Sequence, residues 1–316
     1  MTNSISIIVP LFNEAANIAE LHRRIIAALD GGGNPFEVIY IDDGSTDETD
    51  KILGSIAASD TRSRIISLTR NFGQTAAMMA GIDNASNDVI IPMDGDLQND
   101  PVDIPRLIEK LDEGFDVVSG WRKDRKDPWL TKKFPSQMAN KLISWVTGVR
   151  LRDYGCTLKA YRRSSLEGVR LYGEMHRFIP IYASWRGGKV TELPVSHHPR
   201  RHGKSNYGLG RVFKVLMDLL VVRFLERYAT KPIYVFGMVG MGSIVFSLVS
   251  GFYAVYLKLF EGTSFIQTPL PLLVVMSFIT GIMCILMGLI AEILTRTYFE
   301  SQEKKTYGIK NMLNFD

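Results

Sequence analysis

The sequence predicts an α/β domain with a mostly parallel sheet and helices on both faces, followed by an interfacial helix and a two-helix transmembrane hairpin. Two observations carry this prediction. Short β-branched runs alternate with stretches of helical spacing through the first part of the chain. Two long uncharged runs then lie close together in the last third. With 316 residues, the chain is long enough for a domain of about 200 residues and a membrane-bound remainder.

Five strands are predicted before residue 122, each rich in apolar and β-branched residues. They are residues 4–10, 36–43, 64–70, 88–94 and 115–121. Helical spacing is clearest between these strands, at Ile18, Leu21, Ile25, Leu29, Ile104, Leu107, Ile108 and Leu111. Strands that are apolar on both faces and alternate with helices favour a parallel sheet covered on both sides. Ligands in such sheets bind beyond the carboxyl ends of the strands.

Acidic and amide residues gather where three of these strands end. The positions are Asn13 and Glu14, Asp42 and Asp43, and Asp94 and Asp96. Like charges at one edge of a sheet repel each other unless a cation or hydrogen-bond donors lie between them. Ser45 and Glu48 fit a capping box for the next helix, with Asp47 as a first-turn charge. Capping does not account for the other carboxylates, so we expect a cation or donor groups among them.

The spacing of Asp94 and Asp96 around a glycine indicates a divalent metal site. Carboxylate oxygens suit Mg²⁺ or Mn²⁺, and phosphate oxygens of a substrate commonly complete the Mg²⁺ shell. Zinc is disfavoured, because Cys156 has no paired cysteine and the histidines at 197, 198 and 202 stand among prolines and arginines. The motifs G-x-G-x-x-G and G-x-x-x-x-G-K-[ST] are absent from the strand-to-helix turns, which lowers the rank of dinucleotide binding and ATP hydrolysis.

The uncharged runs at about 233–257 and 269–292 are each long enough to cross a hydrocarbon core of roughly 30 Å. Buried helices of a soluble protein are the alternative, but a tandem pair joined by a short loop favours a transmembrane hairpin. Basic residues flank both outer ends: Arg211, Lys214, Arg223, Arg227, Lys231, Arg296, Lys304, Lys305 and Lys310. This bias predicts an integral protein of the cell membrane or inner membrane, with the N-terminal domain and both termini cytoplasmic. No signal-peptide pattern is seen at the start.

Apolar residues with interspersed charges run through 209–228 and predict a helix lying in the membrane interface, with a core helix of the soluble domain as the alternative. The net charge of +4 is modest and lies largely near the membrane, which favours anionic lipid over nucleic acid as a partner. Gly237, Gly240 and Gly242 suit close helix packing in lipid, as in a homo-oligomer. The two cysteines give no disulfide framework.

A series of motifs occurs in a fixed order ahead of the hairpin. They read VPLFNEAANI, YIDDGSTDET, LTRNFGQTAAMMAGI, MDGDLQNDP, SGWR, DYGCTLKAYRR and RRHGKSNYG. In this order the chain resembles a family 2 glycosyltransferase of the GT-A fold, which is Rossmann-like. More narrowly, it is similar to the polyprenyl-phosphate glycosyltransferases, a group that includes dolichol-phosphate mannose synthases and bacterial undecaprenyl-phosphate sugar transferases. The likeness covers nearly the whole chain and leaves out only its last residues.

The resemblance implies roles for individual positions. Nucleotide-sugar contacts match Pro10, Phe12, Glu14, Asp42, Asp43, Asp94 and Lys132. Metal ligands match Asp94, Asp96 and Gln98, and the diphosphate faces Arg122. The motif R-x-x-G-x-S-K, which gathers donor and acceptor phosphates, starts at Arg200, and the acceptor-phosphate candidates are Arg200, Arg201, Lys204 and Ser205. The last Lys of the motif is Asn206 here, so Lys204 or Arg201 is expected to supply that charge. A solvated basic loop is the alternative for this segment.

The implied reaction is metal-dependent transfer of one sugar from a nucleoside-diphosphate sugar, with UDP-sugar favoured, to an undecaprenyl- or dolichyl-type polyprenyl phosphate, with inversion. A divalent ion and Arg122 would stabilise the departing diphosphate. A lipid monophosphate with a second pKa of about 6 is largely dianionic at neutral pH, so no strong base is required. Asp153 is the candidate for orienting the acceptor or taking a residual proton. The alternative is a surface ion pair of Asp153 with Arg152 or Arg150.

The expected division of the chain is a GT-A catalytic domain over 1–205, an amphipathic region over 206–231, two spans within 232–296 and a cytoplasmic tail over 297–316. Two other functions stay open. One is a glycosyltransferase acting on a different lipid or on a polysaccharide, although the Q-x-x-R-W motif of processive enzymes is absent. The other is a noncatalytic membrane subunit that binds nucleotide sugar. Retention of all the metal and diphosphate candidates together speaks against that second alternative.

Overall fold

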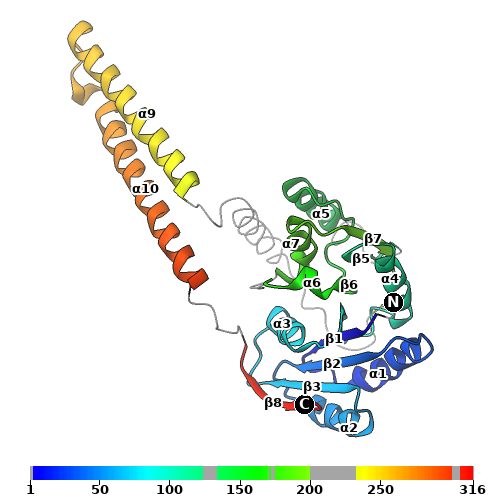
Figure 1. Ribbon diagram of the computed structural model, residues 1–316. Helices are drawn as coiled ribbons and strands as arrows, with labels where there is room; N and C mark the ends of the chain where they lie inside the picture. Colours follow the sequence, from blue (N-terminus) through cyan, green and yellow to red (C-terminus); the bar gives the residue numbers. More distant parts are fainter. Residues whose placement is uncertain are drawn as a thin grey trace. The chain divides into compact units, whose positions relative to one another are not determined.

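The structure, a computed structural model, describes residues 3–123, 134–169, 171, 175–199, 233–300 and 307–315 (Figure 1). The chain forms two compact units. One comprises Met1–Leu219 together with Lys305–Asp316, and the other comprises Leu220–Lys304. The predicted interfacial helix at 209–228 lies outside the described residues, as do the candidate site residues Lys132, Arg200, Arg201, Lys204 and Ser205.

The first unit is built on one mixed sheet whose strands follow the order β7-β5-β6-β4-β1-β2-β3-β8. The strands are β1 (Ile5–Leu11), β2 (Phe36–Asp42), β3 (Ser63–Leu68), β4 (Val89–Pro92), β5 (Val117–Trp121), β6 (Lys159–Arg162), β7 (Val190–Pro194) and β8 (Ile309–Leu313). Neighbours pair in parallel except where β6 meets β4 and β5 and where β8 meets β3. The predicted mostly parallel sheet is confirmed, and each of the five predicted strands is present with ends shifted by one or two residues.

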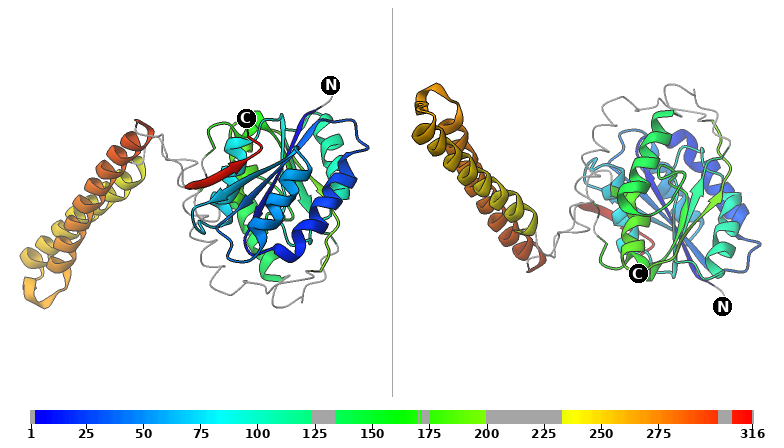
Figure 2. Two further views of the ribbon diagram at one scale, coloured as in Figure 1. Left: turned by 90° about the horizontal axis from the view of Figure 1, so that it is seen from below. Right: turned by 90° about the horizontal axis from the view of Figure 1, so that it is seen from above.

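Helices cover both faces of this sheet, as Figure 2 shows. They are α1 (Ala15–Leu29), α2 (Thr49–Ser59), α3 (Gln74–Asn84), α4 (Ile104–Asp112), α5 (Phe134–Thr147), α6 (Arg163–Leu166) and α7 (Ile179–Trp185). Successive side chains of a strand point to opposite faces, so each buried strand serves two layers. Ile7 of β1 packs in the same core cluster as Leu21 of α1. The neighbouring Ile8 faces the other way, against Gly81 of α3, where a Cβ would collide with its side chain.

Three strands were not predicted from the sequence. Strands β6 and β7 are short, and β8 lies within the segment predicted only as a cytoplasmic tail. β8 pairs with β3 in antiparallel register, with Ile66 beside Met312. The residues after the apolar helices therefore complete the edge of the sheet in the first unit.

The capping box predicted at Ser45 and Glu48 is wrong. Helix α2 begins at Thr49, and Glu48 makes no side-chain capping hydrogen bond. The hydroxyl of Ser45 instead accepts a hydrogen bond from the backbone N–H of Asn13 at 2.9 Å. Asp47 accepts from the backbone N–H of Thr49 at 3.0 Å and so caps the helix in its place. The polar residues of this turn thus join two neighbouring loops as well as starting a helix.

The second unit contains two long antiparallel helices, α9 (Ile233–Phe260) and α10 (Leu270–Glu300). Stretches Val235–Phe260 and Leu270–Ala291 are long and apolar enough to cross a membrane. Most of their large apolar side chains are exposed, which is unfavourable in water and suits a hydrocarbon environment. The helices pack closely at Gly240 and Gly281, because a Cβ on either glycine would lie under 3 Å from the backbone oxygen of the other. Gly240 is therefore used within the hairpin itself.

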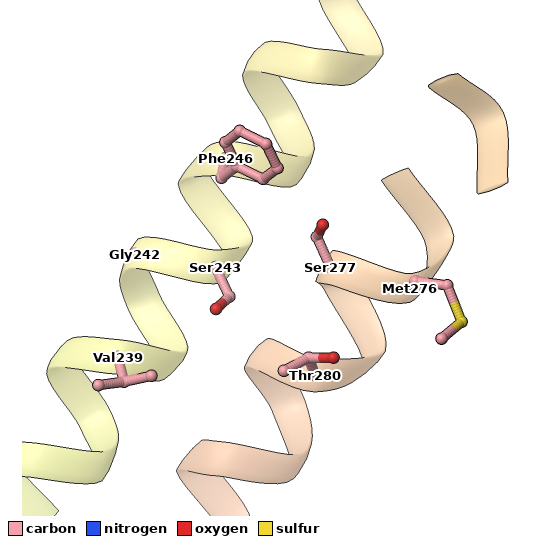
Figure 3. Close-up of a pocket in the computed structure, with 7 residues that line it drawn as sticks. All are labelled: Val239, Gly242, Ser243, Phe246, Met276, Ser277 and Thr280. Atoms are coloured by element: carbon pink, nitrogen blue, oxygen red, sulfur yellow. The ribbon is translucent and has the colours of Figure 1, made fainter. Parts of the chain in front are cut away.

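A shallow groove of about 390 Å³ runs along the hairpin. Figure 3 shows the residues that line it: Val239, Gly242, Ser243 and Phe246 on α9, with Met276, Ser277 and Thr280 on α10. None of these side chains titrates near neutral pH or carries a charge. The groove therefore lacks the groups that the predicted chemistry needs.

Candidate active site

The chemistry-bearing residues lie at the carboxyl ends of three neighbouring strands, β4, β1 and β2. These strands run parallel, with Leu11 beside Asp42 and Ile8 beside Pro92 in register. Parallel neighbours place their carboxyl ends at one edge of the sheet, so the loops that follow them face the same space. The structure thus brings together the acidic strand ends that the sequence indicated.

The turn after β1 is tied to the turn after β2. Asn13 adopts a positive φ of 56°, a conformation that asparagine tolerates better than most residues. In this conformation its backbone N–H donates to the Ser45 hydroxyl, and its side-chain oxygen accepts from the backbone N–H of Thr46 at 2.8 Å. The Phe12 side chain beside it is 44% exposed. An exposed aromatic ring on a fixed turn gives a surface on which a nucleobase can stack.

Two buried carboxylates follow β2 and are held by backbone groups. Asp42 accepts a hydrogen bond from the backbone N–H of Ser45 at 3.0 Å. Asp43 accepts from the backbone N–H groups of Phe72 and Gly73, at 2.7 and 2.8 Å. Burial raises the pKa of Asp43, and the two N–H bonds oppose that shift. The β3-to-α3 loop is therefore fastened to the end of β2 through this one side chain.

The carboxylate that follows β4 is held by side chains. Asp94 accepts a hydrogen bond from the Gln74 amide at 2.8 Å and another from the Thr157 side chain. Burial raises the pKa of Asp94, and the negative charge of Asp96 raises it further. The hydrogen bond from Thr157 and the positive charge of Arg122 act in the opposite direction. The negative charges of Asp94 and Asp96 thus repel each other at short range.

The turn after Asp94 presents the other expected metal ligands. Asp96 is buried, and its carboxylate accepts from the backbone N–H of Gln98 at 3.1 Å. Leu97 between them has a positive φ of 61°, which makes the turn tight. A later segment docks on this turn: His198 donates its backbone N–H to the Gln98 carbonyl at 2.9 Å, and its ring lies 2.8 Å from Asp100. The turn is therefore held by a hydrogen bond within it and by contacts from His198.

Arg122, at the end of β5, forms a two-pronged ion pair with Asp153. The distances are 2.7 Å from Nε to Oδ2 and 2.9 Å from Nη2 to Oδ1. Asp153 is only 6% exposed, and it also accepts from the backbone N–H of Gly155 at 3.0 Å. Although burial disfavours the charged guanidinium, the hydrogen bond and charge of Asp153 raise the pKa of Arg122. The predicted alternative of a surface pair is wrong, since Asp153 is buried and Arg152 pairs with Glu192.

A buried lysine supports the loop that carries Asp153. The Lys159 ammonium donates to the backbone carbonyls of Tyr154, at 3.2 Å, and Cys156. Lys159 is 2% exposed, and burial lowers its pKa to about 8. A lysine at this depth is destabilising unless hydrogen bonds and nearby carboxylates compensate it. Its charge lies close enough to Asp94 to lower the pKa of that carboxyl.

The residues present fit a divalent cation. All the side-chain groups at the metal candidates Asp94, Asp96 and Gln98 offer oxygen atoms, which Mg²⁺ and Mn²⁺ prefer. The charge of Asp96 raises the pKa of Asp94, and a bound cation would relieve that repulsion. Among the residues that the structure describes, no group of three or more His, Cys, Asp or Glu side chains surrounds one point. A Mg²⁺ ion held by one or two carboxylates commonly takes its remaining ligands from water and substrate phosphates.

Sequence reasoning named most of the described residues at this edge. The structure gathers Pro10, Phe12, Glu14, Asp42, Asp43, Asp94, Asp96, Gln98, Arg122 and Asp153 on the loops and strand ends of the first unit. Sequence reasoning did not name Gln74 and Thr157, which hold Asp94, or Lys159, which holds the Asp153 loop. All three lie within the sequence motifs that carry the family resemblance. Only Gln74 could have been identified as a site residue, because it begins the helix that follows a strand end.

Known proteins are similar in sequence to this chain along nearly its whole length. The model of glycosyl transferase family 2 matches residues 6–170. A dodecaprenyl-phosphate galacturonate synthase of Rhizobium johnstonii is 40% identical, over 98% of this chain and 93% of the relative. An undecaprenyl-phosphate 4-deoxy-4-formamido-L-arabinose transferase of Shewanella sediminis is 35% identical, over 98% of this chain and 92% of that relative. A transferase of the same name from Pseudomonas aeruginosa is 34% identical over 98% of this chain.

Solved structures share the fold of the first unit. Glucosyl-3-phosphoglycerate synthase from Mycobacterium tuberculosis, in complex with Mn²⁺, UDP and phosphoglyceric acid, superimposes with a TM-score of 0.55. The alignment covers 70% of this chain and 78% of that chain at 20% sequence identity. The same enzyme with Mn²⁺ and UDP-glucose gives a TM-score of 0.54. Together with the family match over the motifs described above, these findings show that the chain is a glycosyltransferase of family 2 with a GT-A catalytic fold.

Proposed function

We propose that this glycosyltransferase moves one sugar from a nucleoside-diphosphate sugar to the phosphate of a polyprenyl phosphate, with inversion at the anomeric carbon. One observation carries the proposal. A largely buried, carboxylate-held Arg122 lies beside the Asp94–Asp96 turn, in a chain that matches named polyprenyl-phosphate sugar transferases over 98% of its length. Such enzymes serve biosynthesis of the cell envelope, which is the role we assign to the chain.

The donor nucleotide is assigned to the ends of β1 and β2. Phe12 offers a stacking surface, and the fixed carboxylates of Asp42 and Asp43 offer acceptors to ribose hydroxyls or base N–H groups. Because both carboxylates are already oriented by backbone N–H groups, binding need not order them. UDP-sugar is the favoured donor, since relatives of the fold were solved with UDP and Mn²⁺.

The diphosphate is assigned to the space between the Asp94–Asp96 turn and Arg122. A Mg²⁺ or Mn²⁺ ion held by Asp94, Asp96 and Gln98 would supply positive charge to the leaving diphosphate. Arg122 adds a fixed guanidinium there. Because Asp153 already orients its donors, little reorganisation is needed as charge develops on the leaving group. Lys132, outside the described residues, stays a candidate for a further cation on this side.

The acceptor phosphate oxygen forms the new bond to the anomeric carbon as the bond from that carbon to the diphosphate breaks. A lipid monophosphate with a second pKa of about 6 is already deprotonated at neutral pH, so the step needs no general base. We therefore assign Asp153 to holding Arg122, and not to taking a proton. Its two oxygens are both engaged with the guanidinium.

The acceptor phosphate is assigned to Arg200, Arg201, Lys204 and Ser205, in the segment that follows His198. The assignment is supported by His198, which lies within the described residues and contacts Gln98 and Asp100 of the metal turn. Basic residues that follow His198 in the chain would bring cations toward an anionic lipid headgroup. Anionic headgroups attract nearby basic residues.

The membrane arrangement follows from the hairpin and the last strand. Strand β8 belongs to the same sheet as β1–β7. A chain that leaves this unit, crosses a membrane twice and returns to the same sheet has both outer ends of its hairpin on one side. The basic flanks favour the cytoplasm for that side, so we propose that the catalytic domain and both termini are cytoplasmic. The domain bounds expected from the sequence stay as proposed, with the last residues added to the catalytic domain.

The experiment is transfer of radiolabel from a panel of UDP- and GDP-sugars to undecaprenyl phosphate by the purified full-length protein with Mn²⁺. Parallel reactions contain EDTA or the Asp96→Asn variant. We expect one donor to give an acid-labile labelled lipid that disappears in both controls. A donor that binds without labelling any lipid would contradict the acceptor assignment, and a protein that binds none of the nucleotides would favour a noncatalytic membrane subunit.

A further inference from the structure

We propose that the C-terminal segment 307–315 positions the donor-binding loop, and that Gly308 is the residue through which it does so. The donor-binding loop is defined as residues 69–73, between β3 and α3. The inference rests on the proposed function in one respect, because the loop is assigned to the donor through the carboxylates that it holds. It adds a role for residues that follow the apolar helices and that the predicted reaction left unused.

The C-terminal segment is fixed to the catalytic unit along its whole length. Strand β8 pairs with β3 from Leu68 to Ile65. Before the strand, the Tyr307 ring is buried and its hydroxyl donates to Asp83 of α3 at 2.9 Å. After the strand, the Asn314 amide donates to the backbone carbonyls of Ala57 and Ser63, at 2.9 and 2.8 Å. The segment is therefore held to the catalytic unit at both of its ends and through its strand.

Gly308 is where this edge meets the donor-binding loop. Its carbonyl accepts a hydrogen bond from the backbone N–H of Thr69 at 2.9 Å. A Cβ on Gly308 would lie 3.0 Å from the Thr69 hydroxyl and 3.7 Å from the Phe72 ring. The absence of a side chain therefore lets the loop approach the segment closely.

A second glycine also approaches the loop closely. Gly44, which follows the β2 carboxylates, has a positive φ of 70°. A Cβ there would lie 2.6 Å from the carbonyl carbon of Arg70 and 2.8 Å from the nitrogen of Asn71. The loop thus contacts both the turn after β2, at Gly44, and the C-terminal segment, at Gly308.

The position of the loop determines the position of two site carboxylates. Phe72 and Gly73 donate both hydrogen bonds that hold Asp43. The next residue, Gln74, donates to Asp94 at 2.8 Å. A bulky side chain at position 308 would press on Thr69 and Phe72 and displace the loop, and the hydrogen-bond donors for both carboxylates would move together. Donor binding is therefore the property that should respond.

The experiment compares Gly308→Val with Asn314→Ala in the full-length protein in detergent or nanodiscs. Asn314→Ala weakens the attachment of the same segment at the end remote from the loop, and Lys310→Ala changes an exposed position of β8 as a neutral control. For each protein we would measure the Kd of UDP and of GDP with Mn²⁺, the KM of the active donor, the KM of undecaprenyl phosphate, and the melting temperature.

We expect Gly308→Val to raise the nucleotide Kd and the donor KM by roughly tenfold, equal to the loss of one or two oriented hydrogen bonds. The KM of undecaprenyl phosphate should stay within about twofold. Asn314→Ala should lower the melting temperature and leave the donor KM unchanged. Equal donor KM values in the two variants at matched loss of stability would overturn the inference, as would a parallel rise in both KM values. A wild-type protein that binds neither nucleotide would instead contradict the proposed function, and with it the donor role of the loop.

Discussion

The two sides of the acidic edge hold their carboxylates by different means. At the ends of β1 and β2, Asp42 and Asp43 accept from backbone N–H groups of neighbouring loops. At the ends of β4 and β5, Asp94 and Arg122 depend on the side chains of Gln74 and Asp153. On the first side Asp42 and Asp43 are fixed by the path of the chain, whereas on the second side Asp94 and Arg122 are fixed by side chains far apart in sequence. Asp96 on the second side still accepts from the backbone N–H of Gln98.

This difference matches the work proposed for each side. A nucleotide needs a rigid surface that is the same before and after the reaction, and backbone donors provide it. A leaving diphosphate gains charge during the reaction, and mobile side chains would have to be oriented in advance to stabilise it. The second side should therefore govern kcat, and the first should govern nucleotide affinity.

The largest expected effect is that of Arg122→Lys. A lysine ammonium cannot form the two-pronged pair with Asp153 and presents a point charge in place of a planar fork. We expect kcat to fall by about a hundredfold or more, with little change in the Kd of the nucleotide. Steady-state kinetics with both substrates saturating checks this. Arg106→Lys, in which the changed side chain is exposed and pairs with the buried Asp103, is the matched control and should stay close to wild type. An equal fall in kcat in both variants would contradict a role of Arg122 in stabilising the leaving diphosphate.

Asp153→Asn should have the next largest effect, because it leaves the guanidinium buried without its carboxylate. Breaking a buried pair in this way lowers stability by about 3–5 kcal/mol. Misplacement of Arg122 should reduce kcat by roughly tenfold to a hundredfold. The shape of the pH–rate profile separates the two roles of Asp153. A holding role leaves the profile unchanged in shape, whereas loss of its acidic limb in the variant would identify Asp153 as a base.

On the nucleotide side, Asp43→Asn should produce a smaller effect of another kind. An amide has one oxygen and cannot accept from both Phe72 and Gly73 as the carboxylate does. We expect the Kd of UDP with Mn²⁺ to rise by roughly tenfold, with kcat changed by less than about threefold. Isothermal titration calorimetry and saturation kinetics give the two values. A fall in kcat at unchanged Kd would contradict the assignment of Asp43 to nucleotide binding.

The smallest expected effect concerns Lys159 and pH. Burial lowers its pKa to about 8 from a value of 10.5, so the unfolded chain binds more protons than the folded chain between these pH values. Stability contributed by this residue should therefore rise with pH across that window, by about 3 kcal/mol in total. The measurement is the difference in unfolding free energy between wild type and Lys159→Met at pH 7.5 and 10.5. A difference independent of pH would show that the ammonium is not desolvated.

The backbone-held side was the easier one to predict from the sequence. Its strands are local apolar runs, and Asp42 and Asp43 stand directly at a strand end, so the position of the strand fixes that of the carboxylates. The acids that flank Gly95 were predicted for the same reason. Local patterns failed where one side chain serves a distant partner. Ser45 has the sequence of a cap, yet the turn after β1 uses its hydroxyl.

Long-range pairs lay beyond the reach of the sequence. Asp153 and Arg122 are 31 residues apart, and nothing in either motif indicates that one orients the other. Strand β8 was missed because it is separated from its partner β3 by the hairpin, and five residues with two charged or polar positions give a weak strand signal. The resemblance to a family supplied the roles of Arg122 and Gln98, which neither spacing nor composition provides.

The most direct test of the central claim follows an oxygen atom. Undecaprenyl phosphate labelled with ¹⁸O in its phosphate is incubated with Mn²⁺ and the donor found active, and the lipid product is examined by ³¹P and ¹³C NMR. We expect ¹⁸O in the bridge between the phosphorus and the anomeric carbon, with the configuration of the sugar inverted relative to the donor. Retained configuration, an unlabelled bridge, or a product carrying two phosphates would contradict attack by the lipid phosphate on the sugar.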